Sequence, residues 1–395
     1  MAGEPSARIA GPVQGWILVT SGWLSVMANQ VLAPMLPTMT AIFRSQPHVQ
    51  LLISLTATGP ALFVALLALP FGFLADGWGR KRLLVSANLV YGLAGIAPFW
   101  LSNLGEIVIT RFAVGIAEAA VMTCGAALIG DFFSGRSRER YFALLTGTAP
   151  IVSSVVTLLG GSLGRASWHA PFLIYGFPFV LIPLIGLFLW EPRQAADCAK
   201  TPSVSQKGQL IPWGVVFWRC CVTIFGMSAF LVTAIQGSFL LDERGVTSPA
   251  MIGLLMGAVM LSNPVGALMF SVLKLESNAR LAVSFGLLAF GHCIMALSTT
   301  WPGVIAGATV ANLGAGFILP TLLTWTLAGL GSRQRTITTG AWMSACFLGQ
   351  FLSPLSIMGL QSVAKSLSMS ILVYAAASGI AAACAVFSVN RARRA

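Results

Sequence analysis

The sequence predicts an all-α protein that crosses a membrane many times, and three observations carry this prediction. Of its 395 residues, 56% are hydrophobic and only 9% are charged, whereas a soluble domain carries about 25% charged residues. The apolar residues gather in runs long enough to cross a hydrocarbon layer about 30 Å thick at about 1.5 Å per residue. These runs are unbroken, whereas the strands of a membrane barrel alternate apolar and polar residues. A soluble enzyme, a secreted disulfide scaffold and a nucleic-acid-binding domain are therefore disfavoured, despite a formal net charge of +12.

Twelve such runs follow one another along the chain, and each is predicted to form one membrane-spanning helix. The first run is longer than the apolar core of a signal peptide and has no small-residue cleavage site in a suitable place, so we expect it to be retained as a helix. The expected helices cover residues 13–36, 49–71, 83–102, 107–129, 141–164, 171–190, 212–236, 249–273, 281–299, 302–329, 336–360 and 368–390.

Basic residues between these helices fall mostly on one side of the membrane. The two termini and the loops after even-numbered helices share that side, and the positive-inside rule places the more basic side in the cytoplasm. We therefore expect both termini to be cytoplasmic. Because the charges mark helix ends and do not gather on one face among aromatic residues, no nucleic-acid partner is expected. The basic side carries Arg8, Arg80, Lys81, Arg82, Arg136, Arg138, Arg140, Arg193, Lys200, Lys207, Lys274, Arg280, Arg333, Arg335, Arg391, Arg393 and Arg394, and the other side carries Arg44, Arg165, Arg244 and Lys365.

The seven cysteines indicate neither a disulfide framework nor a metal site. Cys198 lies in a loop and the others lie within expected helices, and no C-x-x-C or Cys/His ligand spacing occurs. The chain also lacks the G-x-x-x-x-G-K-[ST] loop that would cradle ATP. We expect no metal, no cofactor and no enzymatic activity.

The longest hydrophilic break, residues 191–211, divides the expected helices into two sets of six. A basic segment after the fourth helix, SGRSRER, is echoed by LGSRQRT after the tenth. Repeats of six helices are typical of transporters whose two bundles rock about a shared central site. We therefore predict an N-terminal bundle at 1–190, a cytoplasmic loop at 191–211 and a C-terminal bundle at 212–395.

The segment between the second and third expected helices carries the most specific motif, GFLADGWGRKR. Its residues Gly72, Asp76, Gly79, Arg80 and Lys81 resemble the loop motif G-x-x-x-D-x-x-G-R-[KR] of the major facilitator superfamily. An aspartate can face the partial positive charge of a helix N-terminus, and glycine permits a sharp turn. The resemblance implies the fold of that superfamily, and a cytoplasmic gate at these five residues that clasps the two bundles when the transporter faces outward.

Two further points about this region stay open at this stage. The basic residues of the motif could serve only as topology signals. In the second half, the equivalent segment 266–270 has no acidic residue. We therefore expect the first half to carry the clasp.

Charges at mid-membrane depth are costly and persist mainly where they face a cavity or a partner. Arg111 and Glu118 in the fourth helix are seven residues apart, which places them within about 20° of one face and about 10 Å apart along the axis. RFAVGIAEAA also resembles the fourth helix of the superfamily. We predict Glu118 as the proton-carrying group and Arg111 as its partner. The alternatives are a Glu118 that stays bonded to neighbouring helices, and an Arg111 that binds an anionic substrate or ties its helix to backbone carbonyls.

Other polar and aromatic residues within spans are weaker candidates. Arg219, seven residues into its span, can extend its side chain outward, and His292 is expected to pack as a neutral group. The polar residues expected along a substrate cavity could equally be contacts between helices, and tryptophans and methionines could offer either an apolar substrate surface or ordinary packing. The cavity candidates are Asn29, Gln30, Gln236, Asn312, Trp325 and Gln350, with Trp342 as a further aromatic surface.

Together these features predict a secondary active transporter that works by alternating access. The preferred function is proton-coupled export of a small, largely apolar organic compound by a monomer in the inner or plasma membrane, with the substrate, protons and the lipid bilayer as partners. The exporter motif of the fifth helix is only partly present, because Val156 and Thr157 stand where Gly-Pro is expected before Gly160 and Gly161. The alternatives are a proton-coupled importer of an organic anion bound by Arg111, and a receptor or scaffold that does not transport.

Overall fold

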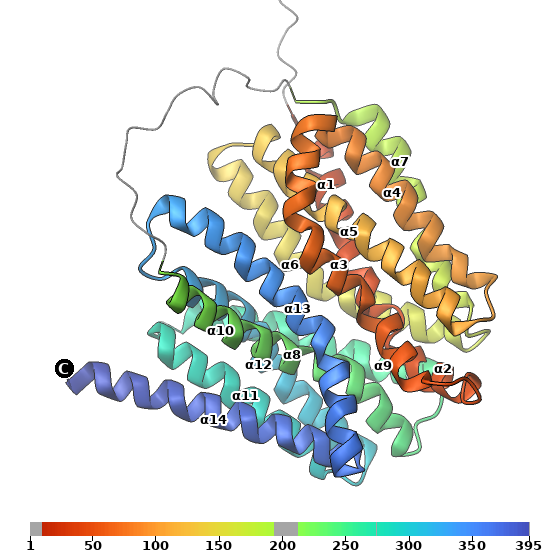
Figure 1. The fold of residues 1–395 in the computed structure, drawn as a ribbon, viewed down its shortest axis with the longest axis vertical. Coiled ribbons are helices and arrows are strands. Elements are labelled where there is room, and N and C mark those ends of the chain that lie inside the picture. The colour runs from red at the N-terminus through yellow and green to blue at the C-terminus, as the bar shows by residue number, and fades with distance from the viewer. Residues whose placement is uncertain (1–9, 193–211, 274, 395) are drawn as a thin grey trace, which may run out of the picture.

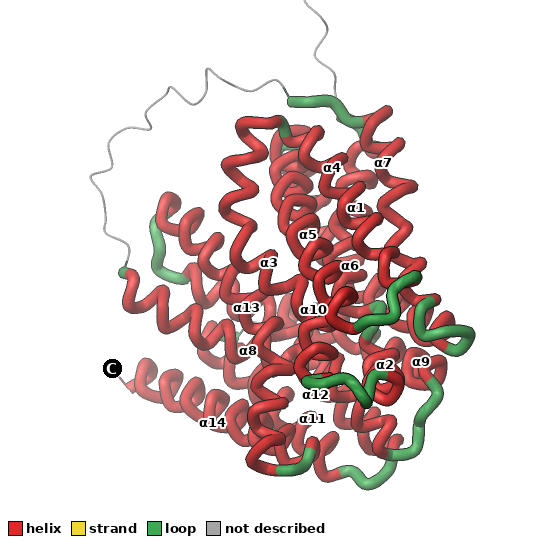
Figure 2. The backbone as a smooth tube through the Cα atoms, turned by 45° about the vertical axis from the view of Figure 1, so that its right-hand side comes forward, coloured by secondary structure: helices red, strands yellow, loops and turns green. Residues whose placement is uncertain are grey.

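The computed structural model describes residues 10–192, 212–273 and 275–394, and within them every regular element is a helix (Figures 1 and 2). Twelve helical segments are long and apolar enough to cross a membrane. The predicted all-α fold with twelve spans is therefore confirmed. The central loop predicted at 191–211 lies almost wholly outside the described residues.

The first half has six spans. They are α1 (Pro12–Gln30) with η1 (Ala33–Met35) and α2 (Leu36–Ile42), α3 (Val49–Trp78), α4 (Arg80–Ile96) with η2 (Ala97–Phe99), α5 (Leu104–Phe132), α6 (Gly135–Gly164), and η3 (Ala170–Gly176) with α7 (Phe177–Phe188).

The second half also has six spans. They are α8 (Trp213–Glu243), α9 (Pro249–Met260) with α10 (Ser262–Val272), α11 (Ser277–Leu297), α12 (Trp301–Leu327), α13 (Ser332–Ala364) and α14 (Leu367–Arg394). Consecutive spans run in opposite directions, so α1 begins and α14 ends on the same side of the bundle, here called the termini side.

Most helices extend beyond the apolar runs that predict them. The second run was expected at 49–71, but α3 continues to Trp78 and stops only where Gly79 adopts a φ of 103°. The helix continues because backbone hydrogen bonding does not stop where the side chains become polar. Loop residues of the predicted gate thus become parts of two helices, with Gly72 and Asp76 on α3 and Arg80 opening α4.

Four spans are interrupted or change helix type near prolines, which lack a backbone N–H and crowd the preceding turn. The first span changes direction between α1 and α2, where Pro34 and Pro37 follow Gln30. The third span ends as the 3₁₀ helix η2, which contains Pro98. The sixth span begins as a 3₁₀ helix ahead of Pro178. The eighth span is divided into α9 and α10 at Leu261, close to Pro264.

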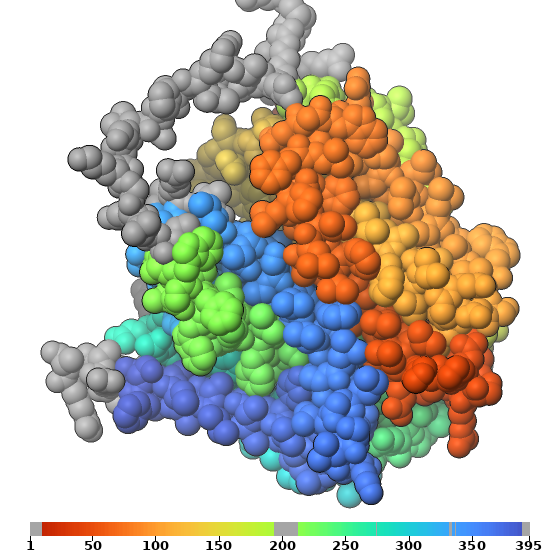
Figure 3. All heavy atoms as spheres, viewed as in Figure 1, coloured from red at the N-terminus to blue at the C-terminus, as the bar shows by residue number. Residues whose placement is uncertain are grey.

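The two halves meet mainly along two helix pairs, α6 with α9 and α3 with α13, and also where η1 and α2 contact α8 and η1 contacts α9. On the side opposite the termini side, a Cβ atom added to Gly161 of α6 would lie 2.7 Å from Gly253 Cα of α9. The hydroxyl of Ser154 donates to the carbonyl oxygen of Gly257 at 2.7 Å. In Figure 3, α13 in blue lies against the orange helices of the first half. Small residues therefore allow the halves to approach backbone to backbone.

The outer surface is largely apolar, as lipid contact requires. Large side chains such as Phe73, Leu187 and Val363 are about four-fifths exposed. In water this surface would be a liability, but a hydrocarbon layer solvates it.

Candidate functional site

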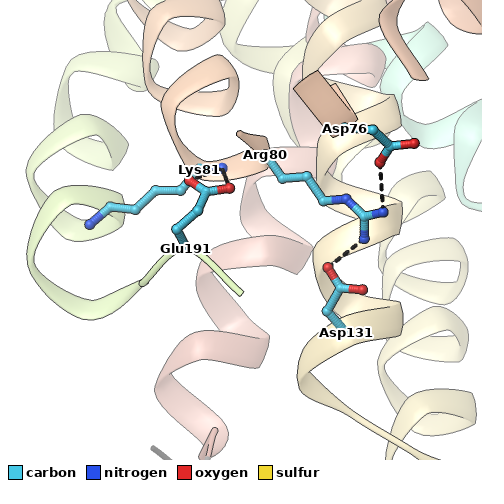
Figure 4. Close-up of polar contacts among 5 residues, drawn as sticks. All are labelled: Asp76, Arg80, Lys81, Asp131 and Glu191. Carbon is cyan, nitrogen blue, oxygen red and sulfur yellow. Dashed lines mark hydrogen bonds and ion pairs between the residues drawn. The ribbon is translucent and has the colours of Figure 1, made fainter. Parts of the chain in front are cut away.

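The predicted gate motif forms a compact ionic cluster where α3 meets α4 (Figure 4). The Arg80 guanidinium donates to a carboxylate oxygen of Asp76 at 2.9 Å and to one of Asp131 at 2.5 Å. Asp76 lies one turn before Arg80 and Asp131 lies near the end of α5. Because Asp76 is 65% exposed, water weakens its ion pair with Arg80. These ion pairs connect the end of α3, the start of α4 and the end of α5.

Glu191, just after α7, contacts the turn between α3 and α4 from another side. Its carboxylate accepts the backbone N–H of Lys81 at 3.2 and 3.3 Å, as Figure 4 shows. It also occupies the space a side chain at Gly79 would need, since an added Cβ would lie 2.9 Å from the Glu191 carboxyl carbon. The Lys81 ammonium donates to the carbonyl oxygen of Gly186 at 2.9 Å. Gly79 is thus required for its backbone conformation and for its lack of a side chain.

The described contacts of Arg80 and Lys81 lie within the first half, although the second half is near. A cavity of about 310 Å³ is lined by Gly72, Asp76 and Arg80, among others. Leu69, on the wall of that cavity, lies 3.3 Å from where a Cβ at Gly340 of α13 would stand. The motif therefore stands beside the interface between the halves. The clasp between them stays a prediction.

Asp131 was not among the residues predicted from the sequence. It lies near a helix end, where a charged residue is ordinary, so depth in the membrane gave no signal. The available signal was its place at the end of the fourth helix, on the same side of the membrane as the basic motif.

Glu118 lies inside the first half and is 0% exposed. One carboxylate oxygen accepts the Ser25 hydroxyl of α1 at 2.7 Å. The other oxygen is buried and has no hydrogen-bond partner among the described residues. An unpaired buried acceptor is costly. The role of Glu118 as the proton-carrying group stays a prediction.

Arg111, on the same helix and also 0% exposed, is held mainly by backbone carbonyls. Its Nε donates to the Thr56 carbonyl oxygen of α3 at 3.3 Å, and one terminal nitrogen donates to that of Ala28 in α1 at 2.5 Å. The guanidinium lies 4.6 Å from the ring centre of Tyr175. Its other terminal nitrogen is buried without a partner among the described residues. Arg111 thus ties α5 to its neighbours, one of the two roles the sequence left open.

Arg111 and Glu118 both reach the C-terminal part of α1, at Ala28 and Ser25, as their shared helix face predicts. Two tyrosines join them there. The Tyr91 hydroxyl donates to the carbonyl oxygen of Leu24 at 2.6 Å. The Tyr175 hydroxyl donates to the carbonyl oxygen of Met27 at 3.1 Å. Neither tyrosine was a sequence candidate. Arg111 and Glu118 are not directly ion-paired in the described structure.

The uncharged cavity candidates differ in their surroundings. Gln30 and Gln236 are buried and Gln350 is half-buried. Asn29 donates weakly to the Ser25 carbonyl oxygen at 3.5 Å, and its own side-chain oxygen is buried without a described partner. Asn312 donates to the Val259 carbonyl oxygen at 2.9 Å, next to the break between α9 and α10. It therefore makes a contact between helices.

In the second half, Arg219 and His292 each make local contacts. Arg219 donates to the carbonyl oxygens of Thr326 and Ala328 at the end of α12, a favourable place for a cation. It also lies 5.4 Å from the ring centre of Trp325. His292 is buried and shares a hydrogen bond with Thr233 at 3.1 Å.

Two apolar clusters share a side chain near the centre of the molecule. The Phe347 cluster joins the halves and is formed by Ala61, Val64, Ala119 and Phe347, with Met122 and Met343 packed against it. The Trp342 cluster lies within the second half and is formed by Met227, Trp342 and Cys346, with Phe230, Leu323 and Met343 around it. Met343 packs against both. Aromatic and thioether groups thus pack at and beside this contact between the halves.

The comparisons with known proteins agree with this geometry. Residues 18–354 match the Major Facilitator Superfamily. The tetracycline resistance protein, class H, of Pasteurella multocida is 28% identical over 45% of this chain and 45% of its own length. The 3-(3-hydroxy-phenyl)propionate transporter of Escherichia coli K12 is 25% identical over 63% of this chain and 62% of its own length. Both matches span less than two thirds of the relative.

A solved structure supports the fold along nearly the whole chain. A bacterial homologue of the human lysosomal transporter Spinster, in an inward-facing and occupied conformation, superposes with a TM-score of 0.75 at 14% identity. The match covers 96% of this chain and 98% of that one. The matched family moves solutes across membranes and does not consist of enzymes. The chain therefore belongs to the major facilitator superfamily and is a multi-pass membrane protein.

Proposed function

We propose that this protein exports a small, largely apolar organic compound in exchange for protons, by alternating access of its two halves. The observation that carries the proposal is the Glu118 carboxyl group, which is fully buried and has one oxygen without a described partner. A charge at this depth is costly, so a carboxyl group that can take up a proton there is suited to couple proton movement to a change of conformation.

The contact with Ser25 links such a proton to the position of α1. As a carboxylate, Glu118 accepts the Ser25 hydroxyl at 2.7 Å. A protonated carboxyl group is also a donor, so the bonding between α5 and α1 changes with each protonation. The apolar clusters around Met343 support an apolar substrate, because ligand pockets are mostly apolar with few polar groups.

Transport in proteoliposomes tests the proposal, with tetracycline as the test compound because a relative is named for resistance to it. We expect the wild-type protein to move protons against tetracycline across an imposed pH gradient. Glu118→Gln keeps the size and polarity of the side chain but cannot release a proton. We expect it to reduce coupled proton movement by at least about a hundredfold, the lower end of what a positioned proton-transfer group contributes to a rate.

The matched control is Glu106→Gln, which alters an exposed carboxylate on the same helix. It should transport as the wild type does. Undiminished gradient-driven flux in Glu118→Gln would contradict the proposal.

An importer of organic anions is the second candidate, and it is favoured by the relative that is named a 3-(3-hydroxy-phenyl)propionate transporter. In this case Arg111 would bind the carboxylate through its one terminal nitrogen without a described partner. Uptake of 3-(3-hydroxyphenyl)propionate that follows an inward proton gradient would favour import. Exchange of tetracycline against protons would favour export.

The remaining parts of the proposal concern arrangement and location. We propose two bundles at 1–190 and 212–395, joined by the loop 191–211, in a monomer in the inner or plasma membrane with the termini in the cytoplasm. Gly72, Asp76, Gly79, Arg80 and Lys81 are proposed as the cytoplasmic gate. The approach of Leu69 to Gly340 beside this motif supports such a role.

A further inference from the structure

Trp342 carries a polar group that the described part of the fold leaves without a partner. The residue is 6% exposed, and its indole nitrogen is buried with no hydrogen-bond partner among the described residues. A buried tryptophan N–H usually finds an acceptor, and leaving one unpaired is costly. The chain keeps this donor in a place where phenylalanine would pack without that cost.

The apolar side chains packed with Trp342 offer it no strong acceptor. It packs with Met227 of α8 and with Cys346, one turn further along α13. Phe230, Leu323 and Met343 complete the Trp342 cluster. Their side chains are uncharged and at best weak acceptors, while the indole N–H can only donate. A strong partner for this donor must therefore come from outside these residues.

The position of the cluster indicates what that partner is. Met343 packs against the Trp342 cluster and also against the Phe347 cluster, which joins the two halves. The Phe347 cluster contains Ala119, the residue after Glu118. A single side chain thus connects the unpaired donor to the interface between the halves, close to the proposed proton site.

We propose that Trp342 is a substrate-binding residue whose indole N–H donates to an uncharged acceptor, such as a carbonyl oxygen, on a compact and largely apolar compound. The body of the compound packs against Met227, Phe230 and Met343, whose flexible or planar side chains adapt to it. This inference rests on the proposed transport of an apolar compound and narrows its substrate class. The cluster carries no charge, so an acceptor that is itself an anion is not the preferred ligand.

Two probes with the same ring system test the inference: 2-acetylnaphthalene, which has a carbonyl acceptor, and 2-ethylnaphthalene, which has none. The purified full chain, in detergent and labelled with ¹⁵N at its indole nitrogens, is titrated with each. Trp342→Phe keeps an aromatic ring, removes the donor and identifies the Trp342 resonance. We expect the ketone to shift that resonance downfield, and the hydrocarbon to leave it near its starting position.

Affinity gives the second readout. Loss of one neutral hydrogen bond corresponds to about a two- to tenfold weaker affinity. Trp342→Phe should show this loss for the ketone and none for the hydrocarbon, and both proteins experience the same partition of probe into micelles. The control is Trp218→Phe, which alters an exposed tryptophan on α8. It should bind both probes as the wild type does.

Several outcomes would overturn the inference. It fails if Trp342→Phe binds the ketone as tightly as the wild type, or if the ketone leaves the Trp342 resonance unmoved. It also fails if the wild type binds neither probe, because the stated ligand class would then be wrong. None of these results touches Glu118-dependent proton movement with tetracycline, so the proposed function fails or stands separately. Should Trp342→Phe not fold, single Trp→Phe variants of the other tryptophans identify the Trp342 resonance by elimination, and its shift in the wild-type spectrum still decides.

Discussion

At the scale of single residues, Arg111 illustrates how a cation is held among apolar helices. Its guanidinium donates in two directions, to the Thr56 and Ala28 carbonyl oxygens, and lies against the Tyr175 ring. A planar group with several fixed donors can make all three contacts at once, whereas the lysine ammonium is a compact point charge. The chemistry of the site therefore demands arginine in particular, not just a positive charge.

Replacing Arg111 by Lys is accordingly expected to destabilise the protein. The variant keeps the charge but loses the stacking and at least one charge-assisted hydrogen bond, which together correspond to about 1–3 kcal/mol of the free energy of unfolding. Unfolding in detergent, followed by circular dichroism, measures this. Arg44→Lys, at an exposed position, is the control and should be neutral. If Arg111→Lys is as stable as the wild type, the planar guanidinium with its several fixed donors is not needed at this position.

At the scale of elements, the turn between α3 and α4 depends on two features of one glycine. Gly79 has a φ of 103°, which side chains rarely adopt, and the carboxyl group of Glu191 fills the space beside it. This turn also aims Arg80 at Asp131 on α5. The positions of three helix ends therefore rest on this short connection.

Gly79→Ala should reveal both features separately. The backbone strain is expected to cost about 1–3 kcal/mol. The clash adds a smaller cost, because the Glu191 carboxyl group lies at the end of a flexible side chain and can move aside by giving up its hydrogen bond from the Lys81 N–H. Adding Glu191→Ala removes the clash but not the strain, so the double variant should be less destabilised than the sum of the two single variants. A double-mutant cycle of unfolding free energies measures the difference. Strict additivity would mean that the Glu191 carboxyl group is not what confines position 79.

How much the sequence could predict also differs from element to element. All twelve spans were predictable, because apolar length is read directly from the residues. The end of α3 was not, since its last turn is polar and is set by Gly79. Glu118 stood out as an acid at membrane depth, whereas Asp131 did not. The missing partner of the Trp342 indole nitrogen depends on packing between distant segments, which no local pattern encodes.

At the scale of the whole molecule, the two halves are held together most closely on the side opposite the termini side. There Gly161 of α6 meets the backbone of α9, with no space for a side chain. Alternating access requires this contact to open and close. A methyl group in this contact should therefore act on the equilibrium between conformations more than on the fold of either half.

Gly161→Ala tests this. The added Cβ would collide with the Pro249 carbonyl oxygen, and such overpacking costs about 1–3 kcal/mol, a shift of about five- to 150-fold in the equilibrium if it acts only on the closed contact. Ser154→Cys adds a thiol at a residue that bonds to Gly257 in this contact. In the Gly161→Ala background this thiol should react faster with an impermeant maleimide added from the side opposite the termini side.

The control is Gly147→Ala on the same helix, where an added Cβ meets nothing within 4 Å. If the introduced thiol is labelled at the same rate in both backgrounds, this contact does not govern which side of the transporter is closed.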